Sequence, residues 1–392
     1  MQVDINKQLE IIKKGCVELI PEDELIAKLK RGKPLRVKWG ADPSAPDIHL
    51  GHTVVLKKLK DLQDLGHEII FLIGDFTARI GDPTGKSETR KPLTKEEVFR
   101  NSKTYQDQVF KILDKNKTRV VYNSHWLSNL KIDEVINLAA KYTVARMLER
   151  DDFMNRFEKE RPISIHEFLY PLIQGYDSVE LKADIEIGGT DQKFNMLVGR
   201  ELQREFKEEP QIIITMPLLE GTDGVQKMSK SLNNYIGITE PPSEIYGKTM
   251  SISDQLMLRY YDVLTDKELS DINKMHPMEA KKRLAKILIT RFYSEQAAIK
   301  AEAEFESIFA KGNLPENIPE ITVNLKSMPV TDLLTSTGMA SSKSEAKRYI
   351  SQGGVRIGGE VVRDEKAQID LIEPKTINVG KRKFIIVKFK EK

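Results

Sequence analysis

Two histidines lie close together where a turn gives way to a helix. The segment His49-Leu50-Gly51-His52 follows the turn-rich run 40–47, and helical periodicity of apolar residues extends over 52–65. The amino end of a helix offers free backbone N–H groups and a partial positive charge, which suit a phosphate group. Gly51 lets a ligand approach the backbone, and both imidazoles can donate hydrogen bonds to it. A pair of capping or surface histidines is the alternative, which so short a pattern does not exclude.

A second segment with cationic side chains lies much later in the chain. Lys227-Met228-Ser229-Lys230-Ser231 carries two ammonium groups three residues apart, which could clamp a triphosphate. The nearby Gly221 and Gly224 would let such a loop move. The alternative is a solvated basic loop, and the pentapeptide alone does not decide between the two.

A third segment, Gly81-Asp82-Pro83-Thr84-Gly85-Lys86-Ser87, resembles a Walker A phosphate loop only in part. That motif needs a glycine five residues before Gly85, and Ile80 stands there, so the sequence disfavours a Walker-type ATPase. Lys86 and Arg90 could instead reach pyrophosphate from a mobile loop, or they could simply be exposed to solvent.

Two further segments carry polar side chains that could bind a small molecule. Tyr170, Gln174 and Asp177 are spaced so that they share one helix face, which could bind a molecule with an amine and a hydroxyl. Asp191, in the segment 188–192 directly after a candidate strand, could accept hydrogen bonds from ribose hydroxyls. A solvated polar stripe and a plain turn are the respective alternatives.

The elements that must position these residues alternate between strand and helix. We expect residues 1–33 and 52–65 to be helical, with Gly66 as a helix stop. Such alternation predicts an α/β fold with a Rossmann-like, doubly wound, mostly parallel sheet, whose ligands bind beyond the carboxyl ends of the strands. The expected strands are 35–39, 68–73, 119–122, 185–187 and 211–215.

The chain of 392 residues divides by composition into three expected domains. These are a catalytic domain over 1–240 with a helical insertion at about 123–165, an α-helical domain over 241–325, and a small α+β domain over 326–392. The last of these carries fourteen Lys or Arg and eight Asp or Glu, a net charge of +6, which favours a polyanion such as RNA as its partner.

The cysteine content and the apolar runs exclude several classes of protein. Cys16 is the only cysteine, which rules out an intrachain disulfide and a cysteine-based zinc site and favours a cytoplasmic setting. The most apolar runs are far too short to span a bilayer, so no membrane association is expected.

Taken in order, HLGH, GDPTGK, YPLIQGYD, GGTDQ and KMSKS resemble the class I aminoacyl-tRNA synthetases. Within that class the chain resembles the bacterial type of tyrosyl-tRNA synthetases, in a longer-tailed subgroup. The segment 340–348 and the following GGVRIGGEVV resemble a small RNA-binding fold shared with a ribosomal protein. The resemblance implies tyrosine–tRNA ligase activity with L-tyrosine, ATP and tRNA(Tyr) as substrates. It further implies Mg²⁺ held through the ATP phosphates rather than by a protein cage, and a homodimer.

The resemblance also implies roles for individual residues. Asp177 would accept a hydrogen bond from the substrate hydroxyl. Lys38 stands where many members have a tyrosine that grips that hydroxyl, and Trp39 occupies a position near the ribose that is often small. The implied tyrosine-binding residues are Lys38, Asp42, Asp82, Tyr170, Gln174, Asp177 and Gln192. The implied ATP-binding residues are Ser44, His49, Gly51, His52, Asp191, Lys227, Lys230 and Ser231. The implied catalytic residues are His49, His52, Lys86, Arg90, Lys227 and Lys230, and the implied RNA contacts are Lys343, Lys347, Arg348 and Arg356.

Two other functions remain open at this point. A tryptophanyl-tRNA synthetase shares the fold and the chemistry, although Asp177 and the basic tail argue against it. A non-catalytic RNA-binding protein on a synthetase scaffold is the other, against which the intact set of phosphate-binding residues argues.

Overall fold

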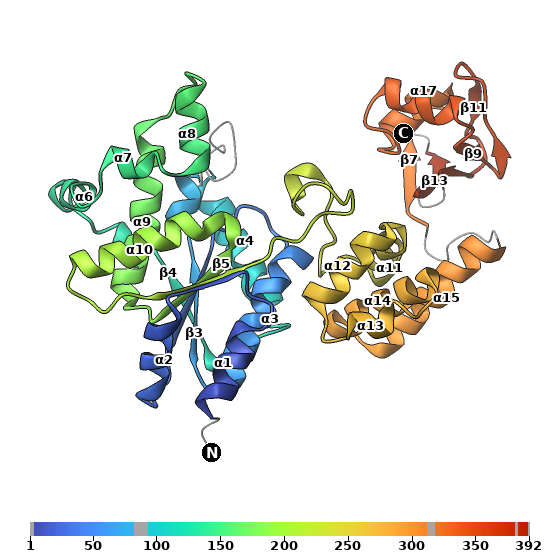
Figure 1. Cartoon of the computed structure of the whole chain (residues 1–392). Coiled ribbons are helices and arrows are strands. Elements are labelled where there is room, and N and C mark those ends of the chain that lie inside the picture. The colour runs from blue at the N-terminus through green and yellow to red at the C-terminus, as the bar shows by residue number, and fades with distance from the viewer. Residues whose placement is uncertain (1–3, 82–92, 312–317, 381–382, 391–392) are drawn as a thin grey trace. The chain divides into compact units, whose positions relative to one another are not determined.

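The computed structural model describes residues 4–81, 93–311, 318–380 and 383–390. These residues form two compact units (Figure 1). The first runs up to Glu240 and also includes Ser251–Leu284, and the second comprises Pro241–Met250 and the chain from Ala285 onward. Residues 251–284, which the sequence places in the helical domain, thus group with the catalytic unit. The three domain boundaries stay a prediction.

The first unit is built on a six-stranded sheet with the order β1-β6-β5-β2-β3-β4. The five strands from β6 to β4 are parallel to one another, and β1 pairs antiparallel with β6 at one edge. The doubly wound, mostly parallel sheet is therefore as the sequence predicts. The strands are β1 (Glu18–Ile20), β2 (Arg36–Ala41), β3 (Glu68–Ile73), β4 (Thr118–Tyr122), β5 (Ile185–Gly189) and β6 (Ile212–Met216).

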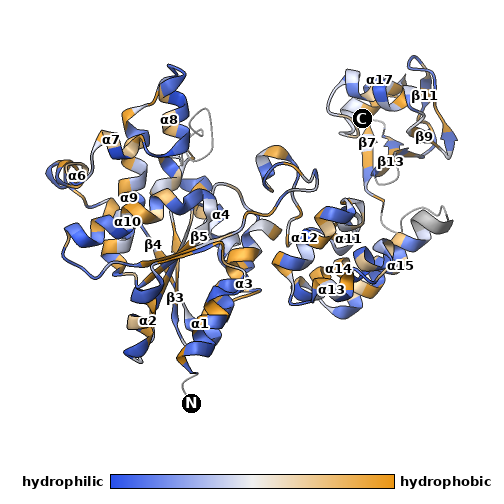
Figure 2. Ribbon diagram, viewed as in Figure 1, coloured by the Kyte–Doolittle hydropathy of each residue, from blue (hydrophilic) through white to orange (hydrophobic). Residues whose placement is uncertain are grey.

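Helices cover both faces of this sheet, as the doubly wound arrangement requires. Figure 1 shows α9 and α10 on one face and α1 and α3 on the other. Figure 2 shows that the strands between them are predominantly hydrophobic, while the helices turn hydrophilic residues outward. The helices up to Glu205 are α1 (Ile5–Lys13), α2 (Glu22–Lys30), α3 (Leu50–Asp64), α4 (Lys95–Val109), α5 (Ser124–Leu127), α6 (Ile132–Ala139), α7 (Val144–Met147), α8 (Asp151–Glu158), α9 (Ile165–Leu181) and α10 (Lys193–Glu205).

The first 33 residues differ from the single helical segment that the sequence predicts. They form α1, the strand β1 and α2 instead, so that prediction is wrong. Gly15, which follows α1, has a φ of +72°, a conformation that glycine adopts without steric cost. Pro21 then precludes a continuous helix, because it lacks the N–H group and restricts the residue before it to an extended conformation.

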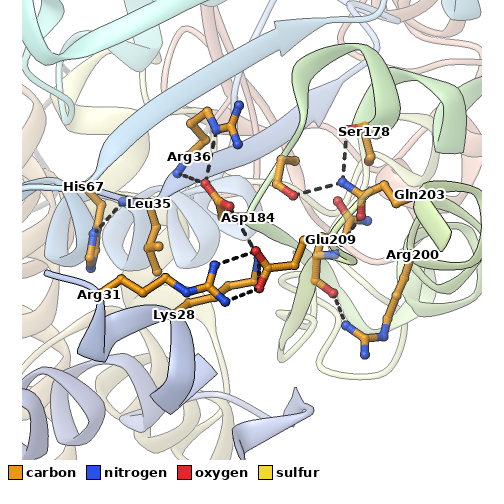
Figure 3. Close-up of polar contacts among 12 residues, drawn as sticks. Lys28, Arg31, Leu35, Arg36, His67, Ser178, Asp184, Arg200, Gln203 and Glu209 are labelled. Carbon is orange, nitrogen blue, oxygen red and sulfur yellow. Dashed lines mark hydrogen bonds and ion pairs between the residues drawn. The ribbon is translucent and has the colours of Figure 1, made fainter. Parts of the chain in front are cut away.

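Ion pairs fasten this amino-terminal segment to the end of the sheet where the parallel strands begin (Figure 3). Asp184, just before β5, accepts hydrogen bonds from the backbone and the side chain of Arg36 at 2.9 and 3.1 Å. The buried Lys28 of α2 lies 3.4 Å from Asp184 and 3.5 Å from Glu209. Arg31 binds Glu209 in a bidentate pair at 2.6 and 2.8 Å. Together these contacts hold α2 against the sheet at the end away from the carboxyl ends of the strands.

The remaining helices and the tail follow the sequence prediction in type. Residues 242–311 are helical, and the tail begins with helices and ends in short strands. Val330, Leu333, Ile350, Val355 and Val387 are among the buried residues of a separate hydrophobic core in this tail. These elements are α11 (Pro242–Ser251), α12 (Asp254–Leu264), α13 (Leu269–Ile272), α14 (Pro277–Phe292), α15 (Glu295–Lys311), β7 (Glu320–Val323), β8 (Ser327–Pro329), α16 (Val330–Ser336), α17 (Lys343–Ser351), β9 (Val355–Ile357), β10 (Glu360–Val361), β11 (Gln368–Asp370), β12 (Lys375–Val379) and β13 (Lys383–Phe389).

Candidate active site

A cavity of about 570 Å³ opens at the carboxyl ends of the parallel strands. Its lining includes residues that directly follow β2 and β5, the two strands between which the order of the sheet reverses. Ligands of doubly wound folds bind at such a switch point. The sequence predicts a ligand site at this edge, and the cavity lies there.

The cavity brings together residues from segments that are far apart in the sequence. All eight expected ATP-binding residues line it, namely Ser44, His49, Gly51, His52, Asp191, Lys227, Lys230 and Ser231. Five of the expected tyrosine-binding residues line it as well, namely Asp42, Tyr170, Gln174, Asp177 and Gln192. Lys38 does not line it. Asp82, Lys86 and Arg90 lie outside the described residues. The four expected RNA contacts lie in the second unit, with Lys343, Lys347 and Arg348 on α17 and Arg356 on β9.

The two histidines stand at the amino end of α3, and their imidazole centroids are 4.0 Å apart. Nδ1 of His52 accepts a hydrogen bond from the backbone N–H of His49 at 3.3 Å. A Cβ atom at Gly51 would lie 3.0 Å from the His49 ring, a tight contact that would push the ring aside. Burial is the main cause that lowers the pKa of both histidines, that of His52 to about 4. At neutral pH the two rings are therefore uncharged and would act on a phosphate as hydrogen-bond donors.

The loop 227–231 supplies the positive charge that the histidines lack. Nζ of Lys227 lies 2.7 Å from Oδ2 of Asp191. Nζ of Lys230 donates a hydrogen bond to the carbonyl of Asp47 and lies 5.8 Å from the centroid of the Tyr105 ring. Burial lowers the pKa of Lys230 to about 8, so its ammonium group is charged at neutral pH and loses its charge above pH 8. Two cations thus reach the same cavity as the helix end of α3.

The buried side chain of Asn234 fixes the conformation of this loop. Its Oδ1 accepts a hydrogen bond from the backbone N–H of Ser229 at 2.8 Å, and its Nδ2 donates to Asp223 at 2.9 Å. Met228 is buried and donates its backbone N–H to the carbonyl of Leu219 at 2.8 Å. The contacts of Asn234 and Met228 together hold the loop in this conformation. The sequence does not single out Asn234, because one asparagine after a basic loop gives no local signal.

A second group of residues that line the cavity is acidic or neutral and polar. Asp42, which directly follows β2, accepts hydrogen bonds from the hydroxyl of Tyr170 at 2.9 Å and from that of Thr77 at 2.6 Å. Both hydroxyls thus donate to the carboxylate, and that of Thr77 also accepts a hydrogen bond from Nδ2 of Asn123 at 3.1 Å. A carboxylate with two hydroxyl oxygens beside it is suited to an ammonium group.

Asp177 is the most deeply buried carboxyl group of the cavity. It accepts hydrogen bonds from Nε1 of Trp126 at 2.8 Å and from Nδ2 of Asn123 at 3.2 Å. Burial raises the pKa of Asp177 to about 7, while those two donors and the charge of Lys38 act in the opposite direction. Asn123 and Trp126 are not among the residues expected from the sequence. Asn123 directly follows β4, so the rule that ligands gather at carboxyl strand ends could have found it.

The side-chain amide of Gln174 is held by a chain of two further residues. Nδ2 of Asn195 donates to Oε1 of Gln174 at 2.8 Å, and Nη1 of Arg150 donates to Oδ1 of Asn195 at 3.3 Å. Arg150 is itself paired with Asp152 at 2.6 Å. Because arginine only donates hydrogen bonds, the amide of Asn195 must present its oxygen to Arg150 and its nitrogen to Gln174. The sequence gives no indication of this chain, which joins the helical insertion to α10 and α9.

The fold and this cavity define a nucleotide-binding enzyme of the synthetase class, and comparison with known proteins agrees. The family model described as tRNA synthetases class I (W and Y) matches residues 30–310, and the chain belongs to this family. A second model, the S4 domain, matches residues 328–371.

Within this family the chain groups with the tyrosine–tRNA ligases. It is 57% identical to the tyrosine–tRNA ligase of Carboxydothermus hydrogenoformans, over 100% of both chains. It is 54% identical to that of Syntrophotalea carbinolica, over 99% of both chains. Among solved structures it resembles a tyrosyl-tRNA synthetase from Archaeoglobus fulgidus complexed with L-tyrosine, with a TM-score of 0.63 and 25% identity. That match covers 76% of this chain and 99% of the other.

The described residues offer neither a membrane span nor a side-chain cluster for a metal. No helix among them is long and apolar enough to cross a membrane. No group of three or more His, Cys, Asp or Glu side chains in the same part of the chain could hold a metal ion.

Proposed function

We propose that this chain is a tyrosine–tRNA ligase that works in the cytoplasm. It activates L-tyrosine with ATP to give tyrosyl-adenylate and pyrophosphate, and then transfers the tyrosyl group to the 3′-terminal adenosine of tRNA(Tyr). One observation carries the proposal. Neutral histidines and two lysines line one part of the cavity, and Asp42, Tyr170 and Asp177 line another.

The chemistry of the first step follows from the charges of the substrates. The carboxylate of tyrosine is ionised at neutral pH, so it attacks the α-phosphorus without a general base. Catalysis then depends on positioning and on stabilising negative charge as it moves to the leaving pyrophosphate. Lys227 and Lys230, which line the cavity, would bind that charge, and His49 and His52 would donate hydrogen bonds to phosphate oxygens. Lys86 and Arg90, which precede α4 in the sequence, would assist them. ATP enters as its magnesium complex, in which phosphate oxygens hold the ion.

The amino-acid end of the cavity supports tyrosine as the substrate. Asp42 and the hydroxyl of Tyr170 would bind the ammonium group, with Gln174 and Gln192 beside the carboxylate. Asp177 would accept a hydrogen bond from the phenolic hydroxyl. Phenylalanine would leave this buried carboxylate without that partner, and tyrosyl-tRNA synthetases are the established example of such a penalty, at about 10⁵-fold.

ATP–pyrophosphate exchange measured with each of the twenty amino acids tests the proposal. We expect exchange to depend on tyrosine. Exchange with tryptophan but not with tyrosine would make the chain a tryptophanyl-tRNA synthetase. No exchange with any amino acid would favour an RNA-binding protein that lacks catalysis.

The tail is proposed to bind tRNA through its phosphates, with residues 241–325 forming a helical domain on the anticodon side. Lys343, Lys347 and Arg348 lie on α17, and Arg356 on the neighbouring strand β9. Lys343 and Lys347 pair with Asp332 and Glu365 at 2.5 and 3.4 Å. These pairs are more than half exposed on the lysine side, so phosphates could replace the carboxylates.

We also propose a homodimer. Large apolar side chains are exposed on the helical insertion and at the start of α9, including Ile132, Ile136, Phe157 and Ile165. Such side chains on a water-facing surface favour burial against a partner, and a second copy of the chain offers the same apolar surface. Light scattering at micromolar concentration should give twice the monomer mass. Ile136→Glu, which places a charge in this surface, should reduce that mass, whereas a wild-type monomer would contradict the proposal.

A further inference from the structure

The side chain of Lys38 is completely buried in the middle of the sheet, 0% exposed, and it does not reach the cavity. Its Nζ lies 3.0 Å from Oε1 of Glu186, which is its register partner on β5. The same Nζ donates to Oγ of Ser178 at 2.7 Å and to the backbone carbonyl of Gln174 at 3.1 Å. These three acceptors use all three hydrogens of the ammonium group.

Two of the three acceptors belong to α9, and they bracket Asp177 in the sequence. Gln174 precedes this residue by three positions and Ser178 follows it directly. The ammonium group therefore fastens the helix to the sheet at the turn that presents both Gln174 and Asp177 to the cavity. A buried cation with this set of contacts is not available to a substrate, so direct contact with the substrate hydroxyl is not the role the geometry supports.

We propose that Lys38 is a positioning residue for amino-acid selection. It holds α9 against the sheet beneath the tyrosine end of the cavity, and its positive charge favours the ionised form of Asp177, which accepts a hydrogen bond. This inference rests on the proposed function, because it assigns a role in recognising the phenolic hydroxyl.

The electrostatic part of the role follows from the groups that surround Asp177. Trp126 and Asn123 donate hydrogen bonds to it, Lys38 faces it from β2 and Glu186 from β5. The positive charge of Lys38 lowers the pKa of Asp177, and the negative charge of Glu186 raises it. The charge of Lys38 thus opposes the effect of burial on Asp177. A substrate without a hydroxyl group would leave Asp177 without that hydrogen-bond donor. The loss of binding free energy is larger when Asp177 is ionised than when it is protonated.

Exchange kinetics of Lys38→Met test both parts. We expect KM for tyrosine to rise about tenfold or more, the scale of losing hydrogen bonds to a charged group. KM for ATP should change less than about twofold, because Lys38 has no contact with the ATP part of the cavity. The preference for tyrosine over phenylalanine should fall. The acid limb of kcat/KM for tyrosine, which reports Asp177 in the free enzyme, should move to higher pH by about one unit.

Glu186→Gln is the matched variant, and it should move the same limb in the opposite direction. It removes the negative charge that raises the pKa of Asp177 and keeps Lys38, so tyrosine activation should persist to lower pH. If Lys38 had only a structural role, the acid limbs of Lys38→Met and Glu186→Gln would move in the same direction, or neither would move. This variant also gives the answer if Lys38→Met does not fold, because an unmoved limb in Glu186→Gln overturns the electrostatic role.

The double variant Lys38→Met/Glu186→Gln separates the two parts of the role. With both charges removed, the acid limb should lie below that of Lys38→Met but still above wild type, because Lys38 has a larger effect on Asp177 than Glu186 has. KM for tyrosine should stay raised, because the contacts to α9 are absent. A wild-type KM for tyrosine in the double variant would overturn the positioning role. If the wild-type chain shows no tyrosine-dependent exchange, the proposed function fails together with this inference. If it shows such exchange and Lys38→Met leaves it unchanged, only the inference fails.

Discussion

Replacing Lys230 by alanine should slow adenylate formation by at least about a hundredfold, the scale of losing one charge-stabilising donor. Two unit charges about 4 Å apart interact by about 4 kcal/mol at an effective dielectric of 20, which is roughly a thousandfold in rate. Lys230 is partly buried and lines the cavity, so this dielectric suits it better than that of bulk water. Lys227 lines the same cavity and would offset part of the loss, which is why we give the lower figure.

The pH dependence of the wild-type enzyme tests the same reasoning without a mutation. Burial lowers the pKa of Lys230 to about 8, so its charge is present below that pH and lost above it. At pH 9 only about one-tenth of the molecules would carry the charge. We therefore expect kcat/KM for ATP to fall as the pH rises through 8. Lys230→Arg should extend activity to higher pH, because a guanidinium group stays charged there.

Single-turnover formation of tyrosyl-adenylate, followed at saturating tyrosine, measures the chemical step directly. Lys60→Ala is a suitable control, because Lys60 is partly exposed on α3, pairs with Asp64 and does not line the cavity. An unchanged rate for Lys230→Ala would refute the assigned role. A loss of equal size in Lys60→Ala would show that the effect is not specific to the cavity.

Contacts around the cavity and in the tail lead to three further predictions. Asn234→Ala should remove the hydrogen bonds that join Ser229 of the loop, through Asn234, to Asp223. KM for ATP should rise severalfold, KM for tyrosine should stay unchanged, and the loop should be cleaved faster by a protease; an altered KM for tyrosine alone would contradict this prediction. Asn195→Ala should remove the donor to Gln174 and weaken tyrosine binding about fivefold to tenfold, within the range for one hydrogen bond, as exchange kinetics at varied tyrosine would show. Removal of the residues after 325 should leave adenylate formation unchanged, because the tail has its own hydrophobic core, and should weaken tRNA charging. Equal loss of both activities would show that the tail is needed for the structure of the catalytic unit.

The sequence predicts those parts of the fold that local patterns encode. The apolar run of β3 and the spacing of Tyr170, Gln174 and Asp177 identify a buried strand and a helix face without further information. β1 escapes detection because it is only three residues long and lies between two helices. β1 is a strand because it pairs with β6, and no local pattern of residues predicts this contact with a distant segment.

The cavity shows the same division between local and distant information. Candidate phosphate-binding residues could be proposed from their types, because histidine, lysine and glycine at a helix end or in a loop suit a phosphate group. Asn123, Trp126 and Asn195 could not, because they act through other side chains that folding brings near them. Lys38 is a different case. The resemblance places it on the substrate, and only the geometry of β2, β5 and α9 indicates that its charge is used beneath the cavity.

The pairing of β1 with β6 has a consequence for synthesis on the ribosome. Glu18 contacts Thr215 across 197 positions of sequence. β1, the first strand of this sheet to be made, can therefore pair only after β6, the last strand of this sheet, has been made. Until β6 has been made, β1 has no strand to pair with. Contacts between such distant positions also form slowly. The amino-terminal segment can therefore join the sheet only after residues 212–216 have been made, and the loop 227–231 and residues 251–284 of the same unit follow later still.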